Sequence, residues 1–174
     1  MNKTVIQLLK ELLDKLAQEE SFQITLMKAE GYTLQNIGLK KGITRERVRQ
    51  IIKKFNQNLN PLMMSIIDYF ITLKKYVTVQ EILDLYDNDA YDKILIQWCK
   101  TNEQLEYLDF ADIFLKTGES KHANEDKVLS LATNFIGEGN DLYENMEELE
   151  SLLKNSDIVK YYKQQFFYYI IKIY

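Results

Sequence analysis

Residues 33–59 constrain the fold of this chain more than any other stretch, because they combine two helical patterns with a glycine between them. Thr33 is a favourable N-cap residue, and the apolar residues that follow it recur at helical spacing. Gly42 can adopt the left-handed backbone conformation that a sharp turn requires. Thr44 then caps a second helix. Its predicted buried stripe is Val48, Ile51, Ile52 and Phe55.

The opposite side of the second helix is strongly basic. All arginines of the chain lie in one five-residue segment, at positions 45, 47 and 49. The planar guanidinium group suits bidentate contacts to guanine and phosphate, which lysine does not replace. The side chains predicted to face outward are Arg45, Glu46, Arg49, Gln50 and Lys53, with Arg47 and Lys54 at the flanks. This pattern is typical of a helix-turn-helix, whose second helix lies in the major groove of DNA.

The segments TLQNIG and GITRERVRQI, three residues apart, resemble region 4 of the bacterial RNA polymerase sigma factors, which reads the promoter −35 element. The resemblance covers roughly residues 20–60, about a quarter of the chain. No preceding segment resembles sigma region 2, so the resemblance implies a sigma-like DNA reader and not a complete sigma factor. Lys41 stands where the family usually has an apolar residue, and Leu39 is expected to take over part of that packing.

The resemblance also implies roles for individual residues. Base edges would be contacted from the start of the second helix, at Thr44 and beyond. The residues concerned are Arg45, Glu46, Arg49 and Gln50, whose side chains suit guanine, cytosine and adenine. Arg47, Lys53 and Lys54 would meet phosphates, with Thr33 as a backbone anchor at the neighbouring helix.

Charge divides the chain into two unlike parts. Residues 1–60 hold 11 basic and 6 acidic residues, a net charge of +5, whereas residues 61–174 hold 11 and 20, a net charge of −9. Pro61, the lone proline, lies at this change and biases Asn60 away from helix. We therefore predict three units: a helix-turn-helix domain over 1–60, an acidic module over 61–117 and a helical C-terminal segment over 118–174.

The acidic module reads as three helices followed by a hairpin. Residues 62–75 are predicted to be a helix, a short extended piece precedes a helix capped by Thr78, and a third helix begins near residue 91. Residues 104–116 alternate as two short strands. The fold class expected is mainly α, with a winged-helix-like second part. The net charge of −5 over residues 61–117 favours a protein-interaction or spacer role over a second DNA site.

Both ends of the chain carry apolar patterns that need a partner. The leucine stripe of residues 3–18 favours packing into the core over dimerisation, and residues 21–29 after it are predicted to be a short helix capped by Ser21. Residues 118–174 read as helices, either a partial repeat or an interaction region. Phe166–Tyr174 contains one charged residue, so we expect this tail to be buried within the chain, in a homodimer or in a larger parent protein.

The chemistry-bearing residue types are sparse. Cys99 is the single cysteine and His122 the single histidine, and there is no glycine-rich phosphate loop, so we expect no catalytic site, metal or cofactor. No apolar run is long enough to span a membrane, which indicates a cytoplasmic protein. Two functions remain open: a sequence-specific regulator that binds double-stranded DNA, or an RNA polymerase-associated factor that mimics sigma without binding DNA by itself.

Overall fold

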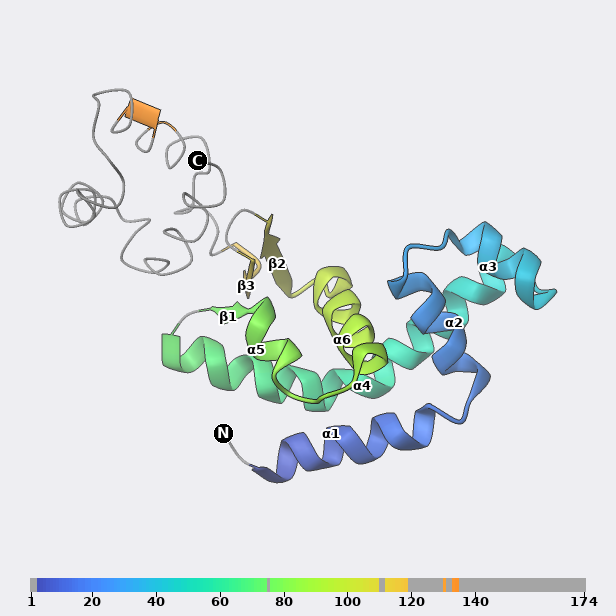
Figure 1. Ribbon diagram of the computed structural model, residues 1–174, viewed down its shortest axis with the longest axis horizontal. Helices are drawn as coiled ribbons and strands as arrows, with labels where there is room; N and C mark the ends of the chain where they lie inside the picture. The colour runs from blue at the N-terminus through green and yellow to red at the C-terminus, as the bar shows by residue number, and fades with distance from the viewer. Residues whose placement is uncertain (1–2, 75, 110–111, 119–129, 131–132, 135–174) are drawn as a thin grey trace.

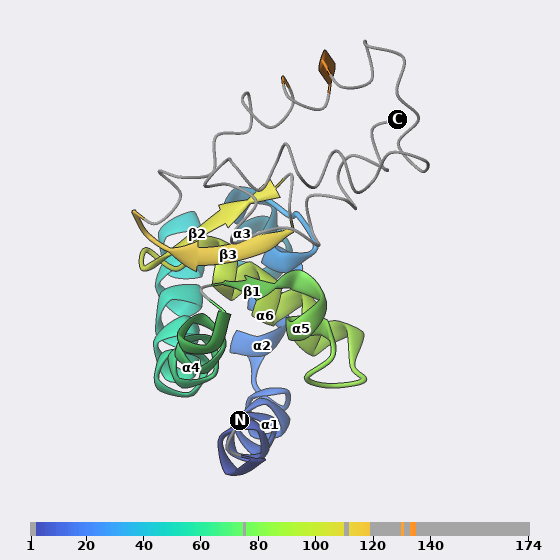
Figure 2. The same cartoon turned by 90° about the vertical axis from the view of Figure 1, so that its left-hand side faces the viewer.

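The computed structural model describes residues 3–74, 76–109, 112–118, 130 and 133–134, and these residues are mainly α-helical (Figures 1 and 2). The helices are α1 (Lys3–Leu16), α2 (Glu20–Ala29), α3 (Leu34–Lys41), α4 (Arg45–Lys74), α5 (Val79–Leu83) and α6 (Asp89–Thr101). The strands are β1 (Val77–Thr78), β2 (Leu105–Leu108) and β3 (Ile113–Lys116). Within this part, no helix is both long and apolar enough to span a membrane.

The first helix packs against the long helix α4, as Figure 1 shows. Leu9, Leu13 and Leu16 are buried in the main core, which confirms that the leucine stripe is used for packing. α2 begins one residue earlier than predicted. Its N-cap residue is Glu19 and not Ser21, and the Ser21 hydroxyl donates a 3.0 Å hydrogen bond to the Glu19 carboxylate.

The predicted end of the helix at Asn60 is wrong: α4 runs without a break from Arg45 to Lys74 with Pro61 inside it. A proline inside a helix removes one hydrogen bond and costs about 3 kcal/mol. The buried stripe of α4 continues past the proline, however, and burying each such side chain stabilises the fold by about 1.5–3 kcal/mol. The buried residues on the two sides of Pro61 are Phe55, Leu59, Met63, Ile66 and Ile67. Packing therefore outweighs the local preference of the proline.

The helices and hairpin of the second part follow in the predicted order. This order is the second half of α4, β1, α5, α6, β2 and β3. β2 and β3 pair antiparallel, with Leu105 opposite Lys116, and β1 adds to β3, so that the sheet order is β1-β3-β2. Thr78 caps α5 as predicted, and Glu81 completes a capping box with it. Figure 2 shows the small sheet on the side of the helices opposite to α1.

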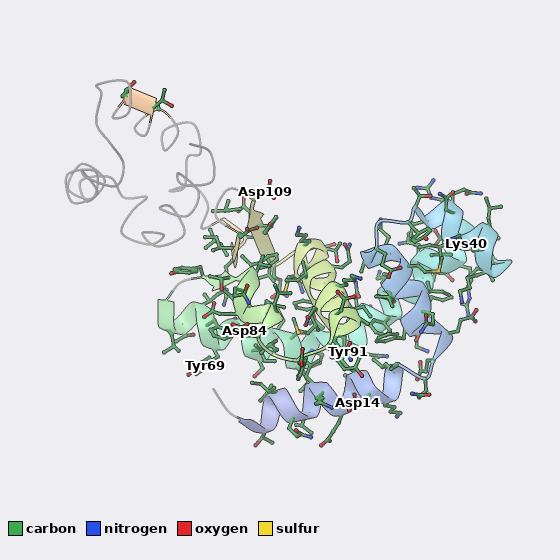
Figure 3. The ribbon with its side chains drawn as sticks, in the orientation of Figure 1. Asp14, Lys40, Tyr69, Asp84, Tyr91 and Asp109 are labelled. Atoms are coloured by element: carbon green, nitrogen blue, oxygen red, sulfur yellow. The ribbon has the colours of Figure 1, made fainter. Side chains whose placement is uncertain are left out.

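The two oppositely charged parts share one hydrophobic core, which extends from Leu9 to Phe114. The ring of Phe22 in α2 lies edge-on to Phe55 in α4 and to Tyr91 in α6, at centroid distances of 6.2 and 5.9 Å. The Tyr91 hydroxyl donates a 2.6 Å hydrogen bond to Asp14 of α1. Both residues are labelled in Figure 3, on neighbouring helices. The packing thus has no boundary at residue 60, and the three-unit division remains a prediction from charge. The predicted helices of residues 118–174 and the apolar tail lie outside the described residues.

We expect Trp98→Ala to destabilise the helix-turn-helix as well as the acidic module. Trp98 is 2% exposed, and its indole N–H donates a 3.2 Å hydrogen bond to the carbonyl of Asn56 in α4. Loss of a buried tryptophan costs about 3–5 kcal/mol. Amide hydrogen exchange should therefore accelerate in α1, α2 and α4 as well as in α6. The exposed Glu103→Ala variant is the control. Acceleration confined to residues 77–116 would contradict the shared core.

Candidate nucleic-acid interface

Local hydrogen bonds fix the start of each helix in the α3–turn–α4 unit. The Thr33 hydroxyl accepts a 3.1 Å hydrogen bond from the Asn36 amide, which caps α3. Gly42 ends α3 in the left-handed region, at φ 66° and ψ 29°, as predicted. The Thr44 hydroxyl accepts a 3.1 Å hydrogen bond from the Arg47 amide at the start of α4. The turn is thus built by short-range contacts that the sequence specifies.

A small apolar cluster holds α3 against α2 and α4. It is formed by the buried residues Ile24, Ile37 and Val48, with Ile51 and Ile52 half-buried around it. Phe55, the fourth residue of the predicted stripe, is buried instead in the main core. The buried side of the second helix is therefore confirmed, and its opposite side is left for solvent or a ligand.

Gly38 is required at the turn, and sequence reasoning did not single it out. A Cβ atom at this position would lie 2.6 Å from the carbonyl oxygen of Ile43, closer than real Cβ atoms approach. The Ile43 amide in turn donates a 3.0 Å hydrogen bond to the Gly38 carbonyl. The signal in the sequence is the glycine four residues before Gly42, inside an otherwise helical pattern. It marks a close approach of two backbones.

The expectation for Leu39 is wrong. Leu39 is 72% exposed and packs under no part of the turn, because it lies on the outer side of α3. Lys41 is half-buried, and its ammonium group lies 4.0 Å from the Glu20 carboxylate at the start of α2. At this position, a charge pair between Lys41 and α2 therefore takes the place of an apolar contact.

All nine residues assigned to DNA contacts are exposed. These are Thr33, Thr44, Arg45, Glu46, Arg47, Arg49, Gln50, Lys53 and Lys54. All but Thr33 come from the turn and the first third of α4, and Thr33 lies at the start of α3. The structure thus places a polar, mainly basic surface at the N-terminal end of a long, firmly packed helix.

Glu46 organises the polar side chains on this surface. Its carboxylate accepts two hydrogen bonds from the Arg49 guanidinium group, at 2.7 and 2.8 Å, and a third of 3.3 Å from the Gln50 amide. The hydrogen bonds from Arg49 lower the pKa of Glu46, and the same contact raises the pKa of Arg49. In the unbound protein, Arg49 and Gln50 are therefore held in one direction by a single acceptor.

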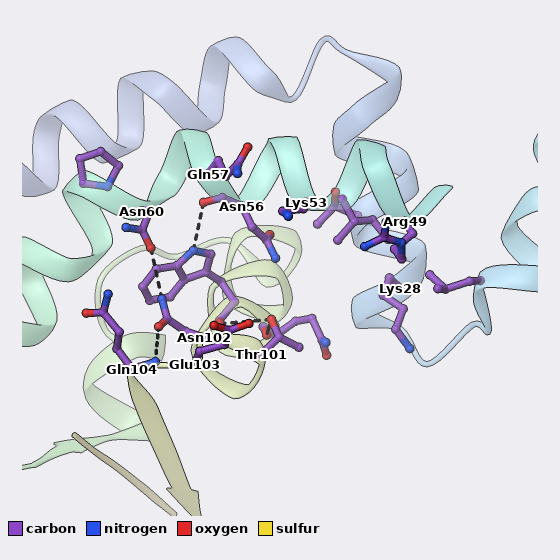
Figure 4. A pocket seen from close by; sticks show the side chains of 16 residues that line it. Lys28, Arg49, Lys53, Asn56, Gln57, Asn60, Thr101, Asn102, Glu103 and Gln104 are labelled. Atoms are coloured by element: carbon purple, nitrogen blue, oxygen red, sulfur yellow. Dashed lines mark hydrogen bonds between the residues drawn. The ribbon is translucent and has the colours of Figure 1, made fainter. Parts of the chain in front are cut away.

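A groove of about 700 Å³ opens beside this surface, between α2, α4 and α6 (Figure 4). Arg49 and Lys53 of α4 line it together with Lys28 of α2. Lys28 was not assigned to the interface from sequence, because nothing in the chain around it marks it as lying near the second helix. In the described part of the chain, no group of three or more side chains could hold a metal ion. His122 lies outside that part.

We expect Gly38→Ala to destabilise the protein. Alanine would gain up to about 1 kcal/mol from helix propensity, but overpacking against a fixed backbone costs about 1–3 kcal/mol. The urea midpoint should therefore fall. The exposed Gln35→Ala on the same helix is the matched control, and a midpoint that stays equal or rises would refute the close approach at the turn.

We expect the Glu46–Arg49 pair to survive well into the acidic range. Because the folded-state pKa of Glu46 is lowered, the pair is intact above the ordinary glutamate pKa and is lost as the pH falls through the lowered value. Carboxyl carbon chemical shifts followed by NMR should report this titration. In Arg49→Ala the pKa of Glu46 should rise, and an unchanged titration would show that the pair is not populated.

Comparison with known protein families gives one match. Residues 12–60 match the family model of sigma-70, region 4. No curated protein and no solved structure matches the chain. The matched segment begins within α1 and ends within α4, one residue before Pro61, so that it contains the whole α3–turn–α4 unit. Residues 12–60 of this chain are therefore a sigma-70 region 4-like helix-turn-helix, a DNA-binding motif.

Proposed function

We propose that the protein is a sequence-specific regulator of transcription that binds double-stranded DNA through the N-terminal third of α4. The observation that carries the proposal is the exposed Arg45–Gln50 surface, which stands on a helix whose other side is buried. A helix positioned in this way can enter the major groove without disturbing the core behind it.

The chemistry of the surface fits base edges. Positions 45, 46, 49 and 50 are separated by one, three and four residues, so they share one side of a helix with 3.6 residues per turn. Arginine suits guanine, glutamate accepts from cytosine and glutamine suits adenine. Glu46 holds Arg49 by a bidentate contact, which reduces the side-chain freedom that Arg49 loses on binding.

The flanking residues fit the sugar–phosphate backbone. Arg47, Lys53 and Lys54 are exposed on α4 beside the base-reading positions, and Thr33 lies at the N-terminus of α3, where backbone amides favour an anion. We assign these residues to contacts that do not depend on sequence. The acidic residues of the winged-helix-like second part would serve a protein partner, since most of that surface repels phosphate.

A second function, association with RNA polymerase without independent DNA binding, is favoured by one observation. Leu39 is a large apolar side chain, 72% exposed, on the helix next to the DNA-reading surface. Region 4 of the sigma family, which this segment resembles, also docks on the polymerase flap. A protein that co-purifies with polymerase but does not bind duplex DNA by itself would have this second function.

The two groups of DNA contacts should respond differently to substitution. Arg45→Ala or Gln50→Ala should cost about 1–3 kcal/mol on the preferred site and relax specificity at one base pair. Lys53→Ala should weaken binding to all sequences alike and lower the salt slope by about one. The measurement is duplex binding at several salt concentrations, on a site selected from a random pool. Lys116→Ala is the control, because Lys116 pairs with Asp68 in the second part.

The double variant Arg45→Ala/Arg49→Ala decides between the two functions. If it binds selected duplexes as well as the unchanged protein, the DNA-reading role of α4 is wrong. Polymerase association, measured in parallel, would then be the remaining function.

A further inference from the structure

The groove beside the DNA-reading surface joins the two parts of the chain. One wall is α4, from Arg49 to Pro61, and the other is the C-terminal end of α6 with the residues that follow it (Figure 4). Two hydrogen bonds tie the walls together: the Trp98 indole to the Asn56 carbonyl at 3.2 Å, and the Asn102 amide to the Asn60 side chain at 3.3 Å. The groove is therefore a fixed feature of the shared core.

The DNA-reading surface leads directly into this groove. Positions 45, 49, 53, 56 and 60 follow one another at steps of four and three residues, which is one stripe along α4. At 1.5 Å per residue, Lys53 lies only about 10 Å along the helix from Asn60. Since the major groove alone is about 12 Å wide, a duplex seated on Arg45 and Arg49 would extend beside the end of α6.

The charge of the groove is opposite to that of the module that forms half of it. Among the described lining residues, Lys28, Arg49 and Lys53 are basic and Glu103 alone is acidic. Lys28 and Lys53 form no ion pair within the described part of the chain. The side-chain amides of Asn56 and Gln97, which also line the groove, form no hydrogen bond there either, so each keeps two N–H donors. Amide and ammonium donors together are the groups that hold phosphate oxygens.

We propose that one strand of the bound duplex runs along this groove, with its phosphates held by Lys28 and Lys53 and by the amides of Asn56 and Gln97. The inference rests on the proposed function and deepens it, because it adds α2 and α6 to the DNA interface. Since Gln97 belongs to α6, the second part of the chain binds DNA backbone despite its net negative charge.

The test compares two substitutions that each add one negative charge, one inside the groove and one outside it. Gln97→Glu replaces a donor by an anion within the groove, whereas Asn58→Asp makes the same change at an exposed position of α4 that does not line the groove. We expect Gln97→Glu to weaken duplex binding about tenfold on all sequences, in line with a lost hydrogen bond to a charged group, and Asn58→Asp to have a much smaller effect. Lys28→Ala should lower the salt slope by about one.

The outcomes separate this inference from the proposed function. Suppose that the unchanged protein binds duplex DNA and that Arg45→Ala weakens this binding. If Gln97→Glu and Asn58→Asp then bind duplex with equal affinity, and Lys28→Ala keeps the full salt slope, the groove carries no DNA strand. Tighter binding by Gln97→Glu would also overturn the proposal, because it would mean that α6 obstructs DNA. Failure of the unchanged protein to bind any duplex would refute the proposed function itself. Thermal melting of each variant checks that all remain folded.

Discussion

The buried stripe of α4 is the interaction on which the rest of this structure depends. Phe55, Leu59, Met63, Ile66 and Ile67 extend it across Pro61, and α1, α2, α6 and the small sheet all pack around the same core. Because the stripe is continuous, the helix persists where its sequence alone favours a break. The same helix begins as the exposed, basic surface of the helix-turn-helix, so one continuous helix carries both the surface proposed to bind DNA and the core packing.

This sharing of one helix has a consequence for function. A regulator made of two domains on a flexible linker could present its second domain anywhere, whereas here hydrogen bonds from Trp98 and Asn102 fix α6 against α4 beside the basic surface. In the proposed complex, a duplex held by Arg45 and Arg49 would therefore lie beside α6. The net charge of residues 61–117 does not describe the groove, because its basic residues, Lys28, Arg49 and Lys53, come from α2 and the first part of α4.

Sequence reasoning was most reliable where the determinant is local. The cap at Thr33, the left-handed Gly42, the capped start of α5 at Thr78 and the hairpin were predicted from residue types and spacing, and all are present. It failed at positions where the geometry of one contact decides and residue type alone does not show it. Ser21 bonds to Glu19 and does not cap α2, Leu39 faces solvent, and Gly38 is needed only because the Ile43 carbonyl returns to within van der Waals distance. These three positions all lie within residues 12–60, the segment that matches the family model.

By itself, the sequence determined the helix-turn-helix and the identity of its exposed residues, because helix caps, turn glycines and apolar spacing act over a few residues. It also determined the order of helices and strands in the second part. Only the tertiary structure decided that α4 continues through Pro61, that the oppositely charged parts share a core, and that Lys28 and Gln97 line one groove with Arg49. The physical reason is that these outcomes depend on burial between residues far apart in the chain, whose free energy exceeds the local cost of a proline and leaves no mark in any short stretch of sequence.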